Sequence, residues 1–197
     1  MTESERKQII ALIQREVIPA IGCTEPIAVA LCVAKATETL GAKPENIKVL
    51  LSANILKNAM GVGIPGTGMI GLPIAVALGA LIGKSDYQLE VLKDSTPEAV
   101  EEGKKLIDEK RICISLKEDI TEKLYIEVTC EAGGEQATAI ISGGHTTFVY
   151  VAKGDEVLLN KQQTSGEEEE EETLELTLRK VYDFALTAPL DEIRFIL

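Results

Sequence analysis

Hydrophobic and polar residues alternate with helical spacing in the first part of the chain. Apolar residues recur every three to four positions over residues 4–17, which predicts an amphipathic helix. Two further apolar runs, one rich in Ala and ending at a Gly, predict helices over residues 24–40 and 72–82. Residues 47–52 are compatible with a short strand or with another helical turn. This part of the chain is therefore predicted to be mostly helical.

The pattern changes after Lys84, where short apolar segments are separated by Gly-containing turns. Such segments are typical of strands, and Pro97 with Glu98 marks the start of one helix that continues to Lys110. The block 86–160 is thus predicted to be a small α+β module with an antiparallel sheet. The expected strands cover residues 87–92, 112–116, 123–130, 137–142, 146–152 and 157–160.

A run of six Glu residues predicts a solvated linker over residues 161–172. Helical periodicity resumes over residues 173–185. We therefore expect an α+β fold in which a mostly helical part, residues 1–84 with 173–197, is interrupted by the module 86–160. The apolar end of the chain carries no helix cap, so we expect the sequence to be part of a longer protein.

Composition excludes several classes of partner. The formal net charge of -12 disfavours nucleic acid and anionic membranes, and the absence of Trp disfavours a platform for stacked bases. The polar N-terminus is unlike a signal peptide, and the apolar run 69–82 is too short to span a membrane. These features predict a cytoplasmic protein without a membrane span.

The segment Gly22–Pro26 is the first candidate for chemistry. Thr24 is suited to cap the following helix, which would place Cys23 beside the positive end of the helix dipole and lower its thiol pKa. A thiolate is the nucleophilic and metal-binding form of cysteine. The other three cysteines occur in apolar patterns without a C-x-x-C spacing, so we expect structural roles for Cys32, Cys113 and Cys130.

Two other segments are open to a functional or a structural interpretation. The loop 61–68 lacks the ending of a P-loop and is not a dinucleotide fingerprint. Its backbone amides could hold a carboxylate, with added donors from the segment 54–58, or its glycines could permit close packing. His145 could be a general base or a ligand contact, but a polar residue at a hairpin is the favoured interpretation.

Four ordered motifs resemble the UPF0597 family, which includes L-cysteine desulfidases and is related to the iron–sulfur L-serine dehydratases. The resemblance implies a lyase with a 4Fe–4S cluster that removes sulfide from L-cysteine, or water from L-serine, and yields pyruvate and ammonia. The implied partner is a small amino-acid substrate, and block 86–160 resembles the inserted domain of serine dehydratases. The motifs lie at residues 22–30, 52–58, 61–68 and 142–146.

The resemblance also implies roles for individual residues. Cys23 would ligate iron, and Lys57 and His145 are the candidates for catalysis. The residues implied in substrate binding are Ser52, Asn54, Asn58, Gly66, Thr67 and Gly68.

The cysteine content departs from the resemblance in one respect. One cysteine cannot hold such a cluster, which needs at least three protein ligands, and no cysteine follows Cys130. We therefore expect the cluster in the full-length protein and expect this chain alone to lack both cluster and activity.

Two other classes of function stay open at this point. The chain could be a non-enzymatic regulatory protein that binds an amino acid through the module 86–160. It could also be a structural unit that forms a homo-oligomer through exposed apolar helices.

Overall fold

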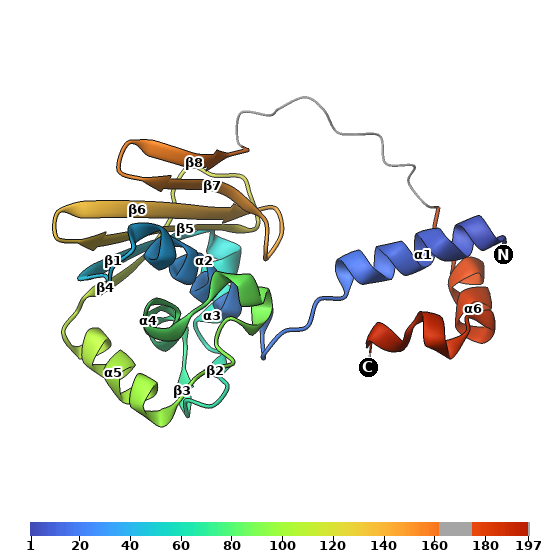
Figure 1. Cartoon of the computed structure of the whole chain (residues 1–197), viewed down its shortest axis with the longest axis horizontal. Helices are drawn as coiled ribbons and strands as arrows, with labels where there is room; N and C mark the ends of the chain where they lie inside the picture. Colours follow the sequence, from blue (N-terminus) through green and yellow to red (C-terminus); the bar gives the residue numbers. More distant parts are fainter. Residues whose placement is uncertain (162–174, 197) are drawn as a thin grey trace. The chain divides into compact units, whose positions relative to one another are not determined.

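A computed structural model describes residues 1–161 and 175–196. The chain divides into two units, one made of Met1–Pro19 with Ser165–Leu197 and the other of Ala20–Thr164. The units are described separately below. Figure 1 traces the order of the elements in each.

A six-stranded sheet forms one layer of the larger unit. Its order is β4-β1-β5-β6-β7-β8, in which β1 pairs in parallel with β4 and all other neighbours are antiparallel. The parallel pair exists because a helical segment connects β1 to β4, whereas the later strands follow one another through short turns. The strands are β1 Asn46–Leu51, β4 Ile112–Leu116, β5 Tyr125–Ala132, β6 Glu135–Ser142, β7 Phe148–Lys153 and β8 Glu156–Asn160.

Helices of this unit gather on one side of the strands (Figure 1). The helix α2, Thr24–Leu40, contacts β5, β6 and β7, and its residues Ile27–Ala34 are all fully buried. The helix α4, Leu72–Ile82, packs on α2, and α5, Pro97–Asp108, packs on α4. Since residues Ile27–Ala34 are apolar on all sides of the helix, this part of α2 can be stable only where it is enclosed by other elements.

A glycine sets the separation of α2 and α4. A Cβ atom added to Gly79 would lie 2.6 Å from the carbonyl oxygen of Ala30. That distance is shorter than real Cβ contacts allow, so the two helix backbones touch at this point. Close approach of this kind is available only to glycine.

The described residues of the smaller unit, 1–19 and 175–196, form a pair of helices with two short 3-10 turns. Helix α1, Glu3–Glu16, begins with a capping box between Thr2 and Glu5, and α6 covers Leu178–Thr187. An ion pair of 3.1 Å joins Lys180 of α6 to Glu5 of α1. The turns η2, Leu190–Glu192, and η3, Arg194–Ile196, follow α6.

The α+β fold class predicted from the sequence is confirmed. Each predicted helix is present within a few residues of its expected bounds, and 47–52 proves to be a strand at β1. The apolar run at 72–82 is a buried helix, as expected. Within the parts of the chain that the structure describes, no helix has the length and apolarity to cross a membrane.

One predicted strand is wrong. Residues 87–92 fall in the 3-10 helix η1, Ser85–Glu90, and the turn after it. Both the backbone N–H and the hydroxyl of Ser85 donate to the carboxylate of Glu38 on α2, and Leu89, Val91 and Leu92 are buried. A tertiary contact with α2 thus decides the local conformation.

The structure also divides the chain at a different place from the sequence-based boundary near residue 85. Helices α2 and α4 share one core with the sheet, and β1, from the segment expected to be helical, lies inside that sheet. Residues 20–164 therefore form one unit rather than a helical part and a separate module. Most of the predicted acidic linker, residues 162–172, lies outside the described residues.

The close approach at Gly79 leads to a stability prediction. Gly79→Ala should lower the free energy of unfolding by about 1–3 kcal/mol, because the added methyl group forces α2 and α4 apart. The matched control is Gly61→Ala, where an added Cβ meets no atom within 4 Å. Urea unfolding followed by circular dichroism measures both variants, and equal stability of the two would contradict the packing argument.

Candidate functional site

The first three sequence motifs meet around the short helix α3, Ala53–Ala59. A Cβ atom on Gly22 would lie 2.9 Å from Cγ of Pro65, so the turn before α2 packs on the loop 61–68. The amide of Asn58, near the end of α3, donates a hydrogen bond of 3.4 Å to Glu25 on α2. Segments that are about 30 to 40 residues apart in the sequence are thus neighbours.

Glu25 is the centre of the polar contacts at the start of α2. The thiol of Cys23 donates to Oε2 of Glu25 across 2.9 Å, and the hydroxyl of Thr24 donates to the same oxygen across 3.3 Å. Oε1 accepts from Asn58. All four residues are therefore connected through one carboxylate.

This carboxylate changes the expected chemistry of Cys23. Its hydrogen bond and its negative charge, together with partial burial, raise the pKa of the Cys23 thiol above its ordinary value. The same hydrogen bond lowers the pKa of Glu25. The predicted low thiol pKa is wrong here, and so is Thr24 as the cap, because Cys23 occupies the N-cap position without a side-chain bond to the helix.

The helix α3 presents a polar face. Asn54, Lys57 and Asn58 are exposed, while Ile55 and Ala59 are buried in the core. The polar residues fall at positions i, i+3 and i+4, which lie on one side of a helix. The structure therefore brings three of the predicted site residues together as one surface of amide and ammonium groups.

The predicted ligand loop is the turn of a small hairpin. Strands β2, Gly63–Ile64, and β3, Met69–Ile70, pair in antiparallel fashion, and Gly66 and Gly68 adopt φ of +77° and +65°. The hydroxyl of Thr67 donates to the carbonyl of Ile64 at 2.7 Å and accepts from the backbone N–H of Met69 at 3.0 Å. Thr67 thus holds the turn in shape, and its hydroxyl is already engaged.

Ser52 is placed differently from the other predicted substrate contacts. It is 2% exposed, its hydroxyl donates to the carbonyl of Lys123 at 2.8 Å, and it accepts from the N–H of Tyr125 at 3.3 Å. These bonds join the end of β1 to the start of β5. Ser52 therefore ties these two strands together, and it also forms part of the wall of a cavity beside α3.

The fourth motif forms the turn between β6 and β7. Ser142 pairs with Tyr125 across the sheet, and the hydroxyl of Ser142 donates to Leu124 at 3.3 Å. The turn that carries His145 thus lies two strands from β1, or roughly 10 Å across the sheet, at the same end of the sheet as Ser52. His145 itself is half-buried.

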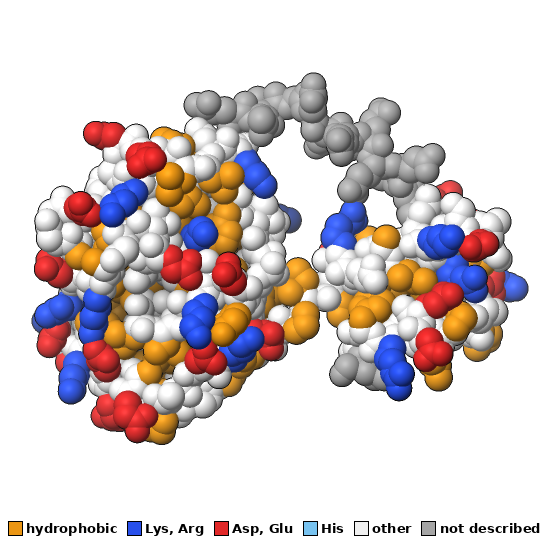
Figure 2. All heavy atoms as spheres, viewed as in Figure 1, with side chains coloured by type: hydrophobic (Ala, Val, Ile, Leu, Met, Phe, Trp, Pro, Cys, Tyr) orange, Lys and Arg blue, Asp and Glu red, His pale blue; other side chains and the backbone are white. Residues whose placement is uncertain are grey.

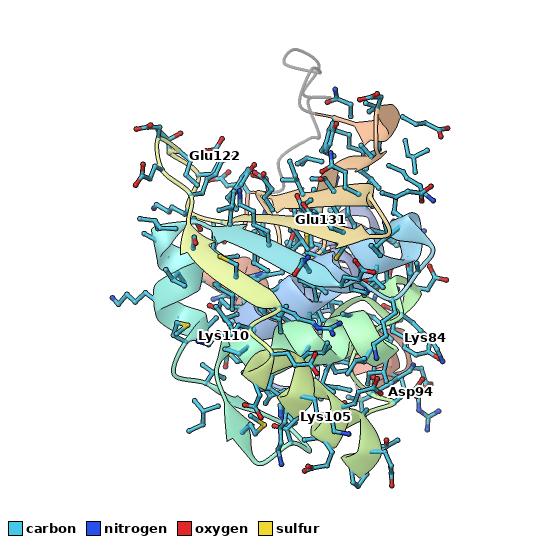
Figure 3. All side chains as sticks on the ribbon, turned by 90° about the vertical axis from the view of Figure 1, so that its left-hand side faces the viewer. Lys84, Asp94, Lys105, Lys110, Glu122 and Glu131 are labelled. Carbon is cyan, nitrogen blue, oxygen red and sulfur yellow. The ribbon has the colours of Figure 1, made fainter. Side chains whose placement is uncertain are left out.

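A cavity of about 550 Å³ lies beside the start of α3. Asn54 contributes to its wall, and the loop between β4 and β5 supplies groups of both charges, including Lys117 and Glu118. Figure 3 labels Glu122 in this loop, well away from the Lys84–Asp94 ion pair at the other end of the unit. Such a cavity is large enough for a small polar molecule.

The metal-ligating residues do not form a complete set. Among the residues that the structure describes, no group of three His, Cys, Asp or Glu side chains lies close enough to hold a metal ion. Cys32 and Cys130 are buried, as expected, and burial raises the pKa of the Cys130 thiol to about 11. Cys113, for which a structural role was expected, is exposed, because β4 is an edge strand. Cys23 alone does not fit a 4Fe–4S cluster.

Glu25 was not selected by the sequence analysis as a site residue. An acidic residue in the first turn of a helix is ordinary, because it interacts favourably with the helix dipole. A carboxylate two residues after a cysteine at a helix start is the signal that could have identified it. The hydrogen bond from Asn58 to Glu25 depends on tertiary structure, so no local sequence pattern predicts it.

Comparisons with known proteins identify close relatives. A UPF0597 protein of Bacteroides fragilis is 99% identical over all 197 residues, and one of Bacteroides thetaiotaomicron is 81% identical over the same length. A UPF0597 protein of Aeromonas hydrophila is 42% identical over 95% of the chain. The chain spans about half the length of these relatives, at 46%, 46% and 43%. No family model and no solved structure matches it.

The carboxylate at Cys23 predicts a change in thiol reactivity. Glu25→Gln should lower the pKa of Cys23 and make its alkylation at neutral pH severalfold faster, because the negative charge that opposes thiolate formation is removed. The rate of iodoacetamide labelling measures this effect in a Cys113→Ser background, which removes the exposed second thiol. Glu156→Gln on β8 is the matched control, and an unchanged rate in Glu25→Gln would show that Glu25 does not govern the thiol.

The buried hydroxyl of Ser52 predicts a stability effect. Ser52→Ala should lower the free energy of unfolding by about 1–3 kcal/mol, because the N–H of Tyr125 loses the hydroxyl oxygen to which it donates. Asn54→Ala, on the exposed face of the adjoining helix, should change it by less than about 0.5 kcal/mol. Thermal unfolding compares the two, and a neutral Ser52→Ala would contradict a supporting role.

Proposed function

Because this chain belongs to the UPF0597 family, we propose that it forms part of a lyase that removes sulfide from L-cysteine, or water from L-serine. The products of that reaction are pyruvate and ammonia. The observation that carries the proposal is the meeting of Cys23, Glu25 and the polar face of α3 at one place. The chain spans 46% of its Bacteroides relatives, so the rest of the polypeptide supplies the remainder of the site in this proposal.

Cys23 is the proposed metal ligand of this chain. A thiol binds iron as the thiolate, and the described residues around it contain no further ligands that would complete a cluster. We therefore assign to this chain one ligand of a 4Fe–4S cluster, with the other ligands from the part of the polypeptide outside it. Glu25 orients the sulfur through its 2.9 Å hydrogen bond.

The face of α3 is the proposed substrate-binding surface. An amino acid carries a carboxylate and an ammonium group, and the surface offers an ammonium on Lys57 and amides on Asn54 and Asn58. Lys57 would bind the carboxylate by charge, and the amides can donate and accept hydrogen bonds. Gly66, Thr67 and Gly68 shape the hairpin at the edge of this surface.

Two groups are candidates for removing the α-proton. Lys57 shares the face of α3 with the proposed substrate contacts, and His145 lies in the turn at the end of β6. Proton abstraction needs a group within hydrogen-bond reach of the substrate. In the proposed lyase, His145 would be the base if Lys57 binds the carboxylate as an ammonium, and Lys57 would be the base only as the neutral amine.

A second function is favoured by one observation. The cavity beside α3 is lined by charges of both signs, which suits an amino acid and does not depend on iron. A regulatory protein that binds an amino acid without catalysis would use this cavity. L-Serine or L-cysteine would then bind to the 197-residue chain by itself.

The test of the lyase proposal uses the full-length Bacteroides fragilis protein, purified without oxygen. Iron, labile sulfide and the release of sulfide from L-cysteine or pyruvate from L-serine are measured for the unchanged protein, Cys23→Ala and Cys113→Ala. The proposal expects a cluster and activity that Cys23→Ala loses by at least about 100-fold. Cys113→Ala, a change at an exposed cysteine on an edge strand, should retain both.

Two results would contradict the lyase proposal. One is activity and iron content that are unaffected by Cys23→Ala. The other is a full-length protein without iron or activity whose 197-residue part binds L-serine or L-cysteine in calorimetry, with binding lost in Lys117→Ala. That second result would support the regulatory function.

A further inference from the structure

Helix α6 carries apolar side chains on a face that the described residues of the smaller unit leave exposed. Leu178 is 91% exposed and Leu186 is 67% exposed, and Val181, Tyr182 and Ala185 between them are exposed as well. These five residues, which we call the apolar stripe, fall at positions i, i+3, i+4, i+7 and i+8. That spacing is typical of a helix face that packs against another element.

The opposite face of α6 already has a partner. Phe184 is buried there, and Lys180 forms the ion pair with Glu5 of α1. A second ion pair of 3.5 Å joins Arg6 of α1 to Glu192 in the turn after α6. Helix α6 is therefore held by α1 through one face, and the apolar stripe is a separate, additional packing surface.

Exposed apolar residues continue beyond the helix. Leu190, Phe195 and Ile196 in the two 3-10 turns are exposed within the same unit. Figure 2 shows hydrophobic side chains on the surface of this unit, between acidic and basic ones. Isolated apolar side chains are ordinary on protein surfaces, but a contiguous set at helical spacing marks a binding surface.

We propose that the apolar stripe docks onto the part of the UPF0597 polypeptide that lies outside this chain. The chain covers 46% of the 99% identical Bacteroides fragilis protein, so more than half of that polypeptide is available as the partner. The partner surface is an apolar helix or sheet face of that remaining part. The inference does not depend on the proposed lyase activity.

The size of the stripe favours this occupant over a second copy. A stable interface between separate molecules buries roughly 800 Å² on each side, and it must overcome the entropy lost when two molecules associate. One face of a helix of 10 residues is small for that purpose. A contact within one polypeptide has a high effective concentration and needs less surface.

Hydrogen–deuterium exchange of the peptide that covers α6 tests the inference. It is compared between the 197-residue chain and the full-length Bacteroides fragilis protein, with the mass of each species determined by light scattering. We expect exchange about tenfold slower in the full-length protein, because docking adds protection that a singly packed helix lacks. Equal exchange in a monomeric full-length protein would overturn the inference.

Matched substitutions separate docking from local helix stability. Leu186→Glu should remove the additional protection in the full-length protein and leave exchange in the 197-residue chain unchanged. Leu158→Glu, at a 56% exposed leucine on β8, should leave α6 exchange unchanged in both. Circular dichroism of the Leu186→Glu chain checks that α6 still folds.

Three other results would also overturn the inference. Protection of α6 in a dimeric 197-residue chain would identify a second copy as the occupant. The same protection in a monomeric 197-residue chain would identify Ala20–Thr164 as the occupant. A loss of the helical circular dichroism signal in Leu186→Glu, but not in Leu158→Glu, would show that Leu186 is needed for the smaller unit to fold.

Discussion

The enclosure of α2 between the sheet and α4 is the constraint on which the larger unit depends. Residues Ile27–Ala34 are buried on every side, so the helix cannot slide or rotate without exposing apolar surface. The contact of Gly79 with Ala30 sets the distance to α4. As a result the first turn of α2, with Cys23 and Glu25, has a defined position beside α3 and the hairpin.

Local electrostatics at that first turn work against the helix dipole. A helix N-terminus favours a thiolate by partial charges at its backbone amides, whereas the Glu25 carboxylate is a full negative charge 2.9 Å from the sulfur. The hydrogen bond that the thiol donates to this carboxylate, together with partial burial and the negative charge, prevails, and the pKa of Cys23 is raised. Cys23 is thus held as a thiol and oriented by a group that also contacts α3. Such an arrangement suits the proposed metal ligand, whose partner ligands would come from elsewhere in the polypeptide.

Much of the fold could be predicted from the sequence, because its signals are local. The Ala-rich run with Gly41 after it identified α2, and Pro97 with Glu98 identified the start of α5. Long-range contacts explain the errors. Glu38 holds Ser85 in a 3-10 turn where a strand was expected. The strand β1 enters a sheet formed by later segments, so the boundary near residue 85 does not separate two units.

The sequence indicates which residues are candidates for the site, but not how the fold places each of them. The polar spacing of α3 is visible in the sequence, and in the structure Asn54, Lys57 and Asn58 share a face. Ser52 has the same polar character in sequence, yet its burial against β5 gives it a supporting role that no local pattern indicates.

The central claim is that this chain holds one ligand of a cluster whose other ligands lie outside it. Anaerobic reconstitution of the 197-residue chain with iron and sulfide is the most direct measurement of that claim. The account predicts no labile sulfide and no bound iron above the level of Cys23→Ala after desalting. A stoichiometric 4Fe–4S cluster that disappears in Cys23→Ala would contradict it.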